Sequence, residues 1–174
     1  MTKIKKSLFI FCGQVGAGKT TTANLFGNKI GAKVFSVDST LKNILKNPSF
    51  VGKDKPPTIK ELNICYNVFS LLTDLALASG QNIIIDGAFS KRVHREVVIQ
   101  SAKKHGAKFF IIYVFCPDDI LKKRVQERFR KGNGVGWNAH LKIKKIYEKI
   151  EKPHYTIDSS RDVKFQLENI LKEI

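Results

Sequence analysis

Cysteine and proline are scarce in this chain of 174 residues, which has three cysteines, five prolines and only 15 acidic residues. Cys12, Cys65 and Cys116 lie far apart and form no CxxC pair, so the sequence shows neither a disulfide framework nor a cysteine zinc site. We therefore expect a reducing, cytoplasmic location. The low proline content, with 43% hydrophobic and 26% charged residues, argues against disordered and collagen-like classes and predicts a folded globular protein.

Long apolar runs are also absent. The longest, residues 109–116, has eight residues, which is less than half of what a membrane-spanning helix needs. We expect no membrane partner. The length suits a single domain over residues 1–174. The four histidines show no metal-ligand spacing, and we assign them no catalytic role.

The scarcity of acidic residues leaves a strongly basic protein. There are 31 lysines and arginines, and the net charge is +16, which exceeds what solubility alone requires. Residues 122–152 contain eleven basic and three acidic residues, so half of the net charge lies in this segment. An anionic partner, nucleic acid among them, is therefore a candidate, although a basic surface can also reflect genome composition or growth conditions.

Short apolar runs alternate with longer stretches of helical period, which is typical of a parallel sheet covered by crossover helices. The predicted fold class is α/β, and the run 109–115 should be a central strand because it has no polar alternation. Thr58 and Glu61 form a capping box that opens a long helix with an apolar stripe, which predicts core packing. We expect five strands near residues 7–12, 33–37, 82–86, 108–115 and 154–157, and helices near 19–30, 58–80, 90–105, 117–131, 139–151 and 161–174.

Two segments break the alternation. Residues 47–57 contain three prolines and a glycine, and residues 131–138 read KGNGVGWN. Both have the composition of mobile surface loops. We expect the first to lie on the acceptor side of the site and the second to form a small lid, because its glycines permit large backbone changes beside a row of arginines.

A phosphate-binding loop is the most specific motif of the chain. Residues 13–20, GQVGAGKT, satisfy GxxxxGK[ST] and stand between an expected strand and an expected helix. Glycines let the backbone wrap a phosphate with its N–H groups, and the following helix adds its positive end. Lys19 can reach the β- and γ-phosphates, and the Thr20 hydroxyl can bind Mg²⁺. The predicted cofactors are ATP and Mg²⁺, with the nucleotide held by Gly13, Gly16, Ala17, Gly18, Lys19, Thr20 and Thr21.

Charged residues near other expected strand ends are further site candidates. Asp86 closes a buried apolar run, where an unpaired carboxylate is costly, and we predict that it acts with Thr20 on the metal. Asp38 follows the second strand, at the sheet edge where α/β folds bind ligands. For both aspartates the alternative interpretation is that they cap a helix or stabilise a turn.

Arg124 and Arg128 lie on one face of an expected helix and could together bind a phosphate. The alternative is that they only form part of a solvated helix face.

Taken together, these motifs make the chain similar to small P-loop kinases that include polynucleotide kinase domains, zeta-toxin-like kinases and chloramphenicol phosphotransferase. The resemblance rests on the phosphate loop, Asp38, and the segments IIIDGAF, FCPDDILKKRVQER and YTIDSS. It implies a three-layer αβα P-loop NTPase sandwich. It also implies that Asp38 is the general base, that Arg124 lies against adenine and that Arg128 grips the transferred phosphate. Acceptor contacts would come from Asp38, Lys42 and Arg95.

The function that follows is an ATP-dependent kinase that transfers the γ-phosphate to a hydroxyl group, with Lys19, Asp38 and Arg128 as catalytic residues. The basic surplus favours a nucleic-acid 5′-hydroxyl as acceptor. A small metabolite, nucleoside or antibiotic hydroxyl is the first alternative. The second is a nucleotide-driven switch without any acceptor, and the oligomeric state is left open.

Overall fold

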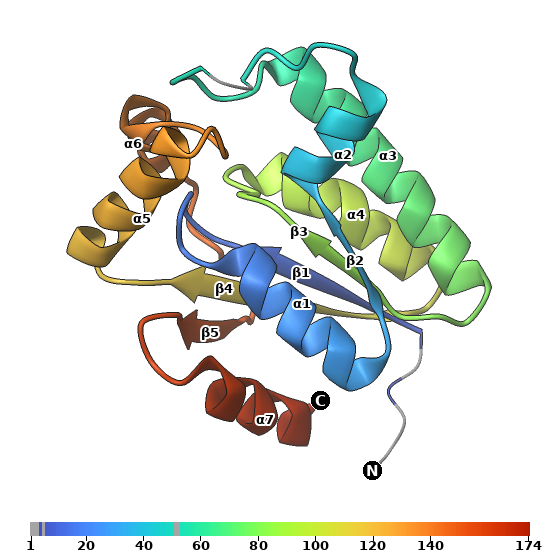
Figure 1. The fold of residues 1–174 in the computed structure, drawn as a ribbon. Helices are drawn as coiled ribbons and strands as arrows, with labels where there is room; N and C mark the ends of the chain where they lie inside the picture. The colour runs from blue at the N-terminus through green and yellow to red at the C-terminus, as the bar shows by residue number, and fades with distance from the viewer. Residues whose placement is uncertain (1–3, 5, 51–52) are drawn as a thin grey trace.

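Five parallel strands form one sheet at the centre of the structure, in the order β2-β3-β1-β4-β5 (Figure 1). This computed structural model describes residues 4, 6–50 and 53–174. The register pairs Phe11 of β1 with Asp86 of β3 and with Ile112 of β4. The carboxyl ends of the strands therefore share one edge. The strands are β1 (Ser7–Cys12), β2 (Lys33–Ser36), β3 (Ile83–Asp86), β4 (Lys108–Phe115) and β5 (Tyr155–Asp158).

The middle position in the sheet belongs to β1, which corrects the expectation of a central strand at residues 109–115. β4 is internal, between β1 and β5, but its first and last residues are exposed. All six residues of β1 are buried. The phosphate loop therefore follows the strand that is best fixed by its neighbours, and this placement limits how far the loop can shift.

Two helical layers cover the sheet and complete the α/β sandwich (Figure 1). Side chains alternate along β1, so that Leu8 and Ile10 enter one core, and Phe9 and Phe11 enter the other. The first core is shared with α3 and α4, and the second with α1, α5 and α7. The helices are α1 (Lys19–Ile30), α2 (Val37–Ile44), α3 (Ile59–Ala78), α4 (Arg92–Lys104), α5 (Asp118–Arg130), α6 (Trp137–Lys145) and α7 (Val163–Glu173). In the described part of the chain, no helix is both long and apolar enough to span a bilayer.

The capping box that opens α3 is confirmed. Thr58 accepts a hydrogen bond from the Glu61 backbone, and the Glu61 carboxylate accepts one from the Thr58 N–H at 2.7 Å. The apolar stripe of this helix is buried at Tyr66 and Phe69, as expected. Its first member, Ile59, is instead 73% exposed. This end of α3 therefore presents an apolar side chain that the core does not use.

The two segments expected to be plain surface loops are both anchored in the core. Phe50 is 1% exposed and Val135 is 7% exposed, and both belong to the core on the α3 side of the sheet. Glu61 holds the first segment further, because its carboxylate accepts hydrogen bonds from the backbone and hydroxyl of Ser49. Val51 and Gly52, which belong to the same predicted loop, lie outside the described residues.

Candidate active site at the phosphate loop

The phosphate loop has the backbone that its glycines predict. Gly13, Gly16 and Gly18 all adopt positive φ angles of 141°, 84° and 87°. A Cβ atom at Gly13 would lie 2.1 Å from the Val114 carbonyl oxygen, and one at Gly16 would lie 2.6 Å from Cγ2 of Val125. Side chains at these two positions would therefore collide with β4 and α5. The loop leads into α1, whose N-terminus contributes free N–H groups and positive potential.

Lys19, Thr20 and Asp86 meet at this edge of the sheet. The Thr20 hydroxyl donates a hydrogen bond to Oδ2 of Asp86 at 2.5 Å, and Nζ of Lys19 donates to the Gln14 carbonyl at 2.9 Å. Asp86 is 2% exposed. Burial raises the pKa of its carboxyl, against the opposing effect of the Lys19 charge. Burial likewise lowers the pKa of Lys19, against the effects of Asp86 and Asp38. The site therefore contains two charges of opposite sign with little solvent to stabilise either.

The donors at this edge fit Mg²⁺. The Thr20 hydroxyl and the Asp86 carboxylate are the hard oxygen ligands that this ion prefers, and the ion usually takes its remaining ligands from water and phosphate. The second carboxylate oxygen of Asp86, Oδ1, is buried and has no hydrogen-bond partner in the described structure. A bound cation or one of its waters would satisfy that oxygen. The same residues could hold the ion against the β- and γ-phosphates of a nucleotide.

Asp38 lies beside this centre without capping the helix that contains it. The side chain that caps α2 is Ser36, which accepts a hydrogen bond from the Ser39 N–H at 3.2 Å. Asp38 is exposed, in the first turn of α2, and lines the cavities on both sides of the phosphate loop. The capping alternative for Asp38 is therefore wrong. Its carboxylate is available to a ligand.

A cleft of about 660 Å³ runs over the phosphate loop and α1. Arg124 lines it and is fixed by Ser159, to whose hydroxyl and carbonyl it donates at 2.8 and 3.1 Å. Arg128 also lines it, next to the Gly134 backbone. The other lining residues include six of the predicted site: Gly16, Gly18, Lys19, Thr20, Thr21 and Lys42. The predicted residues Gly13 and Ala17 are buried within the loop itself, where the Ala17 N–H donates to the Gln14 carbonyl.

A second cavity, of about 530 Å³, opens on the other side of Lys19 and Thr20. It extends from the phosphate loop towards α3, α4 and α6, and it shares Lys19, Thr20, Asp38 and Arg128 with the first cleft. Its outer walls are formed by Pro56 and Pro57 together with the N-terminal parts of α3 and α4 and the C-terminal part of α6. A ligand here would face the terminal phosphate of a nucleotide held in the cleft.

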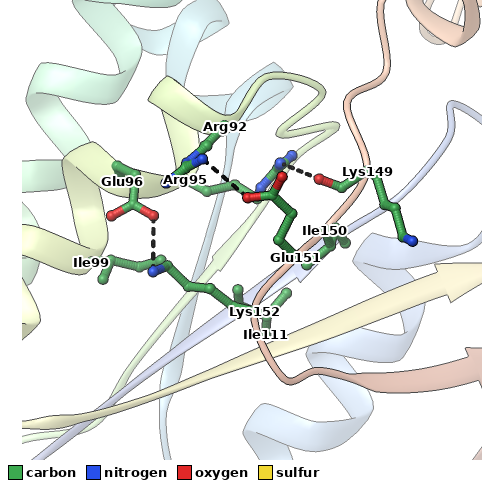
Figure 2. Close-up of a pocket in the computed structure, with 9 residues that line it drawn as sticks. All are labelled: Arg92, Arg95, Glu96, Ile99, Ile111, Lys149, Ile150, Glu151 and Lys152. Atoms are coloured by element: carbon green, nitrogen blue, oxygen red, sulfur yellow. Dashed lines mark hydrogen bonds and ion pairs between the residues drawn. The ribbon is translucent and has the colours of Figure 1, made fainter.

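Arg95, which the sequence suggested as an acceptor contact, does not line either cavity. It is 3% exposed, and its guanidinium donates to the carbonyls of Phe89, Glu148 and Lys149. Figure 2 shows the side chain of Arg95 directed at the Lys149 carbonyl, beside a small cavity of about 30 Å³. The bonds to Glu148 and Lys149 fasten α4 to the segment that follows α6. They also account for the end of α6 at Lys145, short of the predicted residue 151, because that segment leaves the helix to reach α4.

Sequence reasoning missed two residues that shape the site. Asp54 accepts hydrogen bonds from the N–H groups of Asn138 and Ala139, so it caps α6 from a distant loop. His140 is 1% exposed, stacks on Trp137 at 4.5 Å, and neither ring nitrogen has a hydrogen-bond partner among the described residues. The contact of Asp54 with Ala139 joins residues 85 positions apart, so a local sequence pattern does not reveal it. The stacking of Trp137 on His140 is only weakly indicated by the sequence, through their spacing of three residues on a helix.

Comparison with known families gives one match, which covers most of the chain. Residues 8–150 match the AAA_33 family model, which is described as an AAA domain. No curated protein sequence matches the chain. The matched segment contains the phosphate loop, Asp38, Asp86 and both cleft arginines.

Solved structures, two of them of kinases, share the whole fold at low sequence identity. The APS kinase CysC of Mycobacterium tuberculosis, in complex with AMPPNP and APS, has a TM-score of 0.73 at 16% identity, covering 97% of each chain. Kti12 of Chaetomium thermophilum, in complex with ADP-AlF3, has a TM-score of 0.76 at 13% identity, covering 95% of this chain and 96% of that one. A gluconokinase of Sinorhizobium meliloti 1021 has a TM-score of 0.66 at 14% identity, covering 96% and 94%. The chain therefore has the α/β P-loop NTPase fold of these structures.

Proposed function

We propose that this chain, which belongs to the AAA_33 family of AAA domains, is an ATP-dependent phosphotransferase that transfers the γ-phosphate of ATP to an acceptor hydroxyl. The observation that carries the proposal is the meeting of two cavities at one set of residues. The cleft over α1 and the cavity towards α3 share Lys19, Thr20, Asp38 and Arg128. A kinase needs a donor site and an acceptor site that meet at the transferred phosphate, and this arrangement supplies both.

The nucleotide would lie in the cleft over α1. Its phosphates would accept hydrogen bonds from the phosphate loop and the start of α1, with Arg124 towards the base and Lys19 at the terminal phosphate. Thr20 and Asp86 would hold Mg²⁺, which when bound neutralises phosphate charge. Because Asp86 is buried and Lys19 is half-buried, their charges would act on the phosphates with less screening than at the surface.

The transfer step uses the groups between the two cavities. Asp38 orients the acceptor hydroxyl and takes its proton while the acceptor oxygen bonds to the γ-phosphorus. The bond between the γ-phosphorus and the bridging oxygen breaks, and ADP leaves. Lys19 and Arg128 remain on the phosphate oxygens throughout and stabilise the charge that moves to the leaving oxygen. Residues 131–138 would act as the lid, since Asn133 and Gly134 line both cavities.

A nucleotide-driven switch is the rival function, and an acceptor screen separates the two. Radiolabelled ATP is incubated with pools of hydroxyl compounds, and phosphate on the acceptor is measured. We expect one pool to stimulate phosphate transfer.

Lys19→Ala should lower turnover by roughly 10²- to 10³-fold, because it removes a positioned charge. Asp38→Asn should lower transfer while ATP affinity stays near that of the wild type.

Asp119→Asn is the matched control, because Asp119 is an exposed aspartate that lines neither cavity. It should transfer phosphate at the wild-type rate. Slow ATP consumption that no acceptor pool changes would favour the switch. Equal losses of ATP binding and transfer in Asp38→Asn would remove Asp38 from the acceptor side.

A further inference from the structure

Apolar side chains make up most of the wall of the second cavity. Beyond Lys19, Thr20, Asp38, Asp86 and Arg128, the wall is built mainly from α3, α4, α6 and the loops between them, and apolar residues outnumber polar ones there by about two to one. The polar lining residues are Ser36, Asn63, Ser90, Lys91, His94 and Asn133. The apolar lining residues are Val15, Val37, Pro56, Pro57, Ile59, Leu62, Tyr66, Ala88, Val93, Val125, Val135, Ile143 and Ile146.

Several of these side chains are exposed although they face the cavity. Ile59 is 73% exposed, Val93 is 60% exposed and Ile146 is 48% exposed. They come from three different elements, α3, α4 and the residue directly after α6. Exposed apolar surface gathered around one hollow gains roughly 25 cal/mol for each Å² that a ligand covers. A ligand with an apolar body would therefore bind this cavity favourably.

Positive charge is sparse in this cavity and abundant in the neighbouring cleft. Among its described lining residues, Lys19 and Arg128 belong to the phosphate-transfer groups, which leaves Lys91 as the further cation. His94 adds no charge near neutral pH, because burial lowers its pKa. The nucleotide cleft, in contrast, is lined by the five cations Lys19, Lys42, Arg124, Arg128 and Lys131.

One aromatic side chain lines the inner wall, Tyr66, of which 4% is exposed. The Tyr66 ring is stacked on the His94 ring at 4.4 Å and packs against Phe89 at 5.1 Å. These contacts fix the ring in place, so that a ligand contacting it orders no mobile side chain. The volume of about 530 Å³ lies within the range of small-molecule sites and encloses a compact ligand, whereas a nucleic-acid strand needs an open, positively charged groove.

From these observations we infer that the acceptor is a small, uncharged molecule whose hydroxyl group is attached to an apolar body. The apolar body would lie against the exposed side chains of Ile59, Val93 and Ile146, and the hydroxyl would point towards Asp38. An anionic acceptor would meet the Asp38 carboxylate while finding one additional cation, Lys91. The inference rests on the proposed phosphotransfer and names its substrate class.

Binding and transfer are measured separately so that the two proposals can fail independently. Binding is followed by ligand-observed saturation-transfer NMR with four probes: phenylpropanol, sorbitol, a sugar phosphate and a short 5′-hydroxyl thymidine oligonucleotide. We expect phenylpropanol to bind most strongly to the cavity. Val93→Glu and Ile146→Glu should each weaken its binding by roughly 10-fold, because a carboxylate would then lie against the apolar ligand.

Leu75→Glu is the matched control, since Leu75 is 61% exposed on α3 and lines neither cavity. It should bind phenylpropanol like the wild type. The inference is overturned if sorbitol, the sugar phosphate or the oligonucleotide binds the cavity more strongly, or if Leu75→Glu weakens phenylpropanol as much as Ile146→Glu does.

Transfer is then assayed with radiolabelled ATP and a library of uncharged hydroxyl compounds with apolar bodies. Phosphorylation of library members, lost in Ile146→Glu and kept in Leu75→Glu, supports both proposals. A different outcome is that phenylpropanol binds as expected but no library member, sugar or oligonucleotide is phosphorylated. That result would overturn the proposed phosphotransfer, whereas the inferred ligand class of the cavity would still hold. Transfer confined to anionic acceptors would overturn the acceptor class and support the phosphotransfer.

Discussion

Asp86 carries a cost in stability that a bound cation would offset. Its Oδ2 accepts the Thr20 hydroxyl, while its buried Oδ1 has no partner in the described structure. An unsatisfied buried polar group costs about 1–3 kcal/mol, and more when it is charged. A folded protein can retain such an unsatisfied group where a bound ligand offsets its free-energy cost. The sequence could predict this residue, because a carboxylate that closes a buried apolar strand is costly without a partner.

His140 has no comparable sequence signal, and it gives the molecule a pH dependence. It is buried beside the phosphate loop, where burial and the Lys144 charge lower its pKa from the ordinary value of 6.5, against the opposing effects of the Val15 backbone and Asp118. The unfolded chain therefore binds a proton at a pH where the folded protein does not. The contribution of neutral His140 to the free energy of unfolding should accordingly be complete above about pH 6.5. It should decrease as the pH drops below that value. His94, whose pKa burial also lowers, acts in the same direction.

We predict that His140→Phe keeps the stability at pH 7.5 within about 1 kcal/mol, because the ring still stacks on Trp137 and the contact with the Val15 backbone is not a hydrogen bond of normal geometry. The variant should lose less stability than the wild type between about pH 6.5 and 5, where each bound proton contributes about 1.4 kcal/mol per pH unit. Urea unfolding at several pH values measures this. His154→Phe, at an exposed position, should keep the wild-type pH dependence. Identical pH profiles for His140→Phe and wild type would contradict the assignment.

The start of α6 depends on a residue from a different part of the chain. The helix begins after Gly136, which offers no side-chain cap, and Asp54 instead accepts the N–H groups of Asn138 and Ala139. A Cβ atom at Gly136 would lie 2.5 Å from Cγ of Asp54, so the close approach requires glycine. The loop before α3 and the predicted lid are therefore joined through one carboxylate.

We predict that Asp54→Ala destabilises the protein by about 1 kcal/mol, the usual cost of losing a helix cap. The amides of residues 136–140 should also exchange faster, because two of their N–H donors lose their acceptor. Hydrogen exchange with mass spectrometry measures both the site and the extent. Asp162→Ala removes the cap of α7, where Asp162 accepts from Phe165, and should raise exchange there while leaving α6 unchanged. Equal protection of α6 in wild type and Asp54→Ala would refute the link.

Regular elements could be predicted from local pattern, and the exceptions have physical causes. β1, α1 and β4 have the expected bounds because apolar runs and glycines mark their ends directly. α6 begins two residues earlier than expected, at Trp137, because its cap comes from Asp54, which local pattern does not reveal. The same limit explains Arg95, since a buried arginine that binds three carbonyls has the same sequence as one that faces a ligand.

The lid assignment concerns residues 131–138, which comprise the connection between α5 and α6 and the first two residues of α6. Arg128 lies beside the Gly134 backbone, and Asn133 and Gly134 line both cavities. Gly132 and Gly134 adopt positive φ angles of 71° and 84°, so both positions favour glycine. A phosphate that contacts Arg128 would therefore order this segment.

We predict that AMPPNP with Mg²⁺ lowers hydrogen exchange in residues 131–138 more than in α3. The comparison within one molecule controls for a general gain in stability on binding. The ligand should give this protection in the wild type and much less in Arg128→Ala. Uniform protection across both segments would mean that residues 131–138 do not close over the nucleotide.

Net charge was the basis for expecting a nucleic-acid acceptor, and it describes the surface better than the site. Part of the basic surplus is paired at the surface, as in Lys144 with Asp118 and Lys131 with Glu127. Composition cannot show that α3 and α4 place apolar side chains around the second cavity, because that depends on how distant segments meet. The apolar wall favours the small-molecule alternative.

An oligonucleotide separates these two roles of charge. We predict that a 5′-hydroxyl oligonucleotide binds weakly and that its log affinity falls with log salt by about 0.7 for each neutralised phosphate. Lys142→Glu and Lys145→Glu, at exposed positions of α6, should weaken this binding, whereas Lys164→Glu on α7 should change it less. ATP affinity should stay constant in all three variants, because none of these lysines lines the nucleotide cleft. The oligonucleotide should accept no phosphate. Phosphorylation of its 5′-hydroxyl faster than that of the free nucleoside would mean instead that the basic surface delivers the acceptor, and the apolar cavity would then serve another ligand.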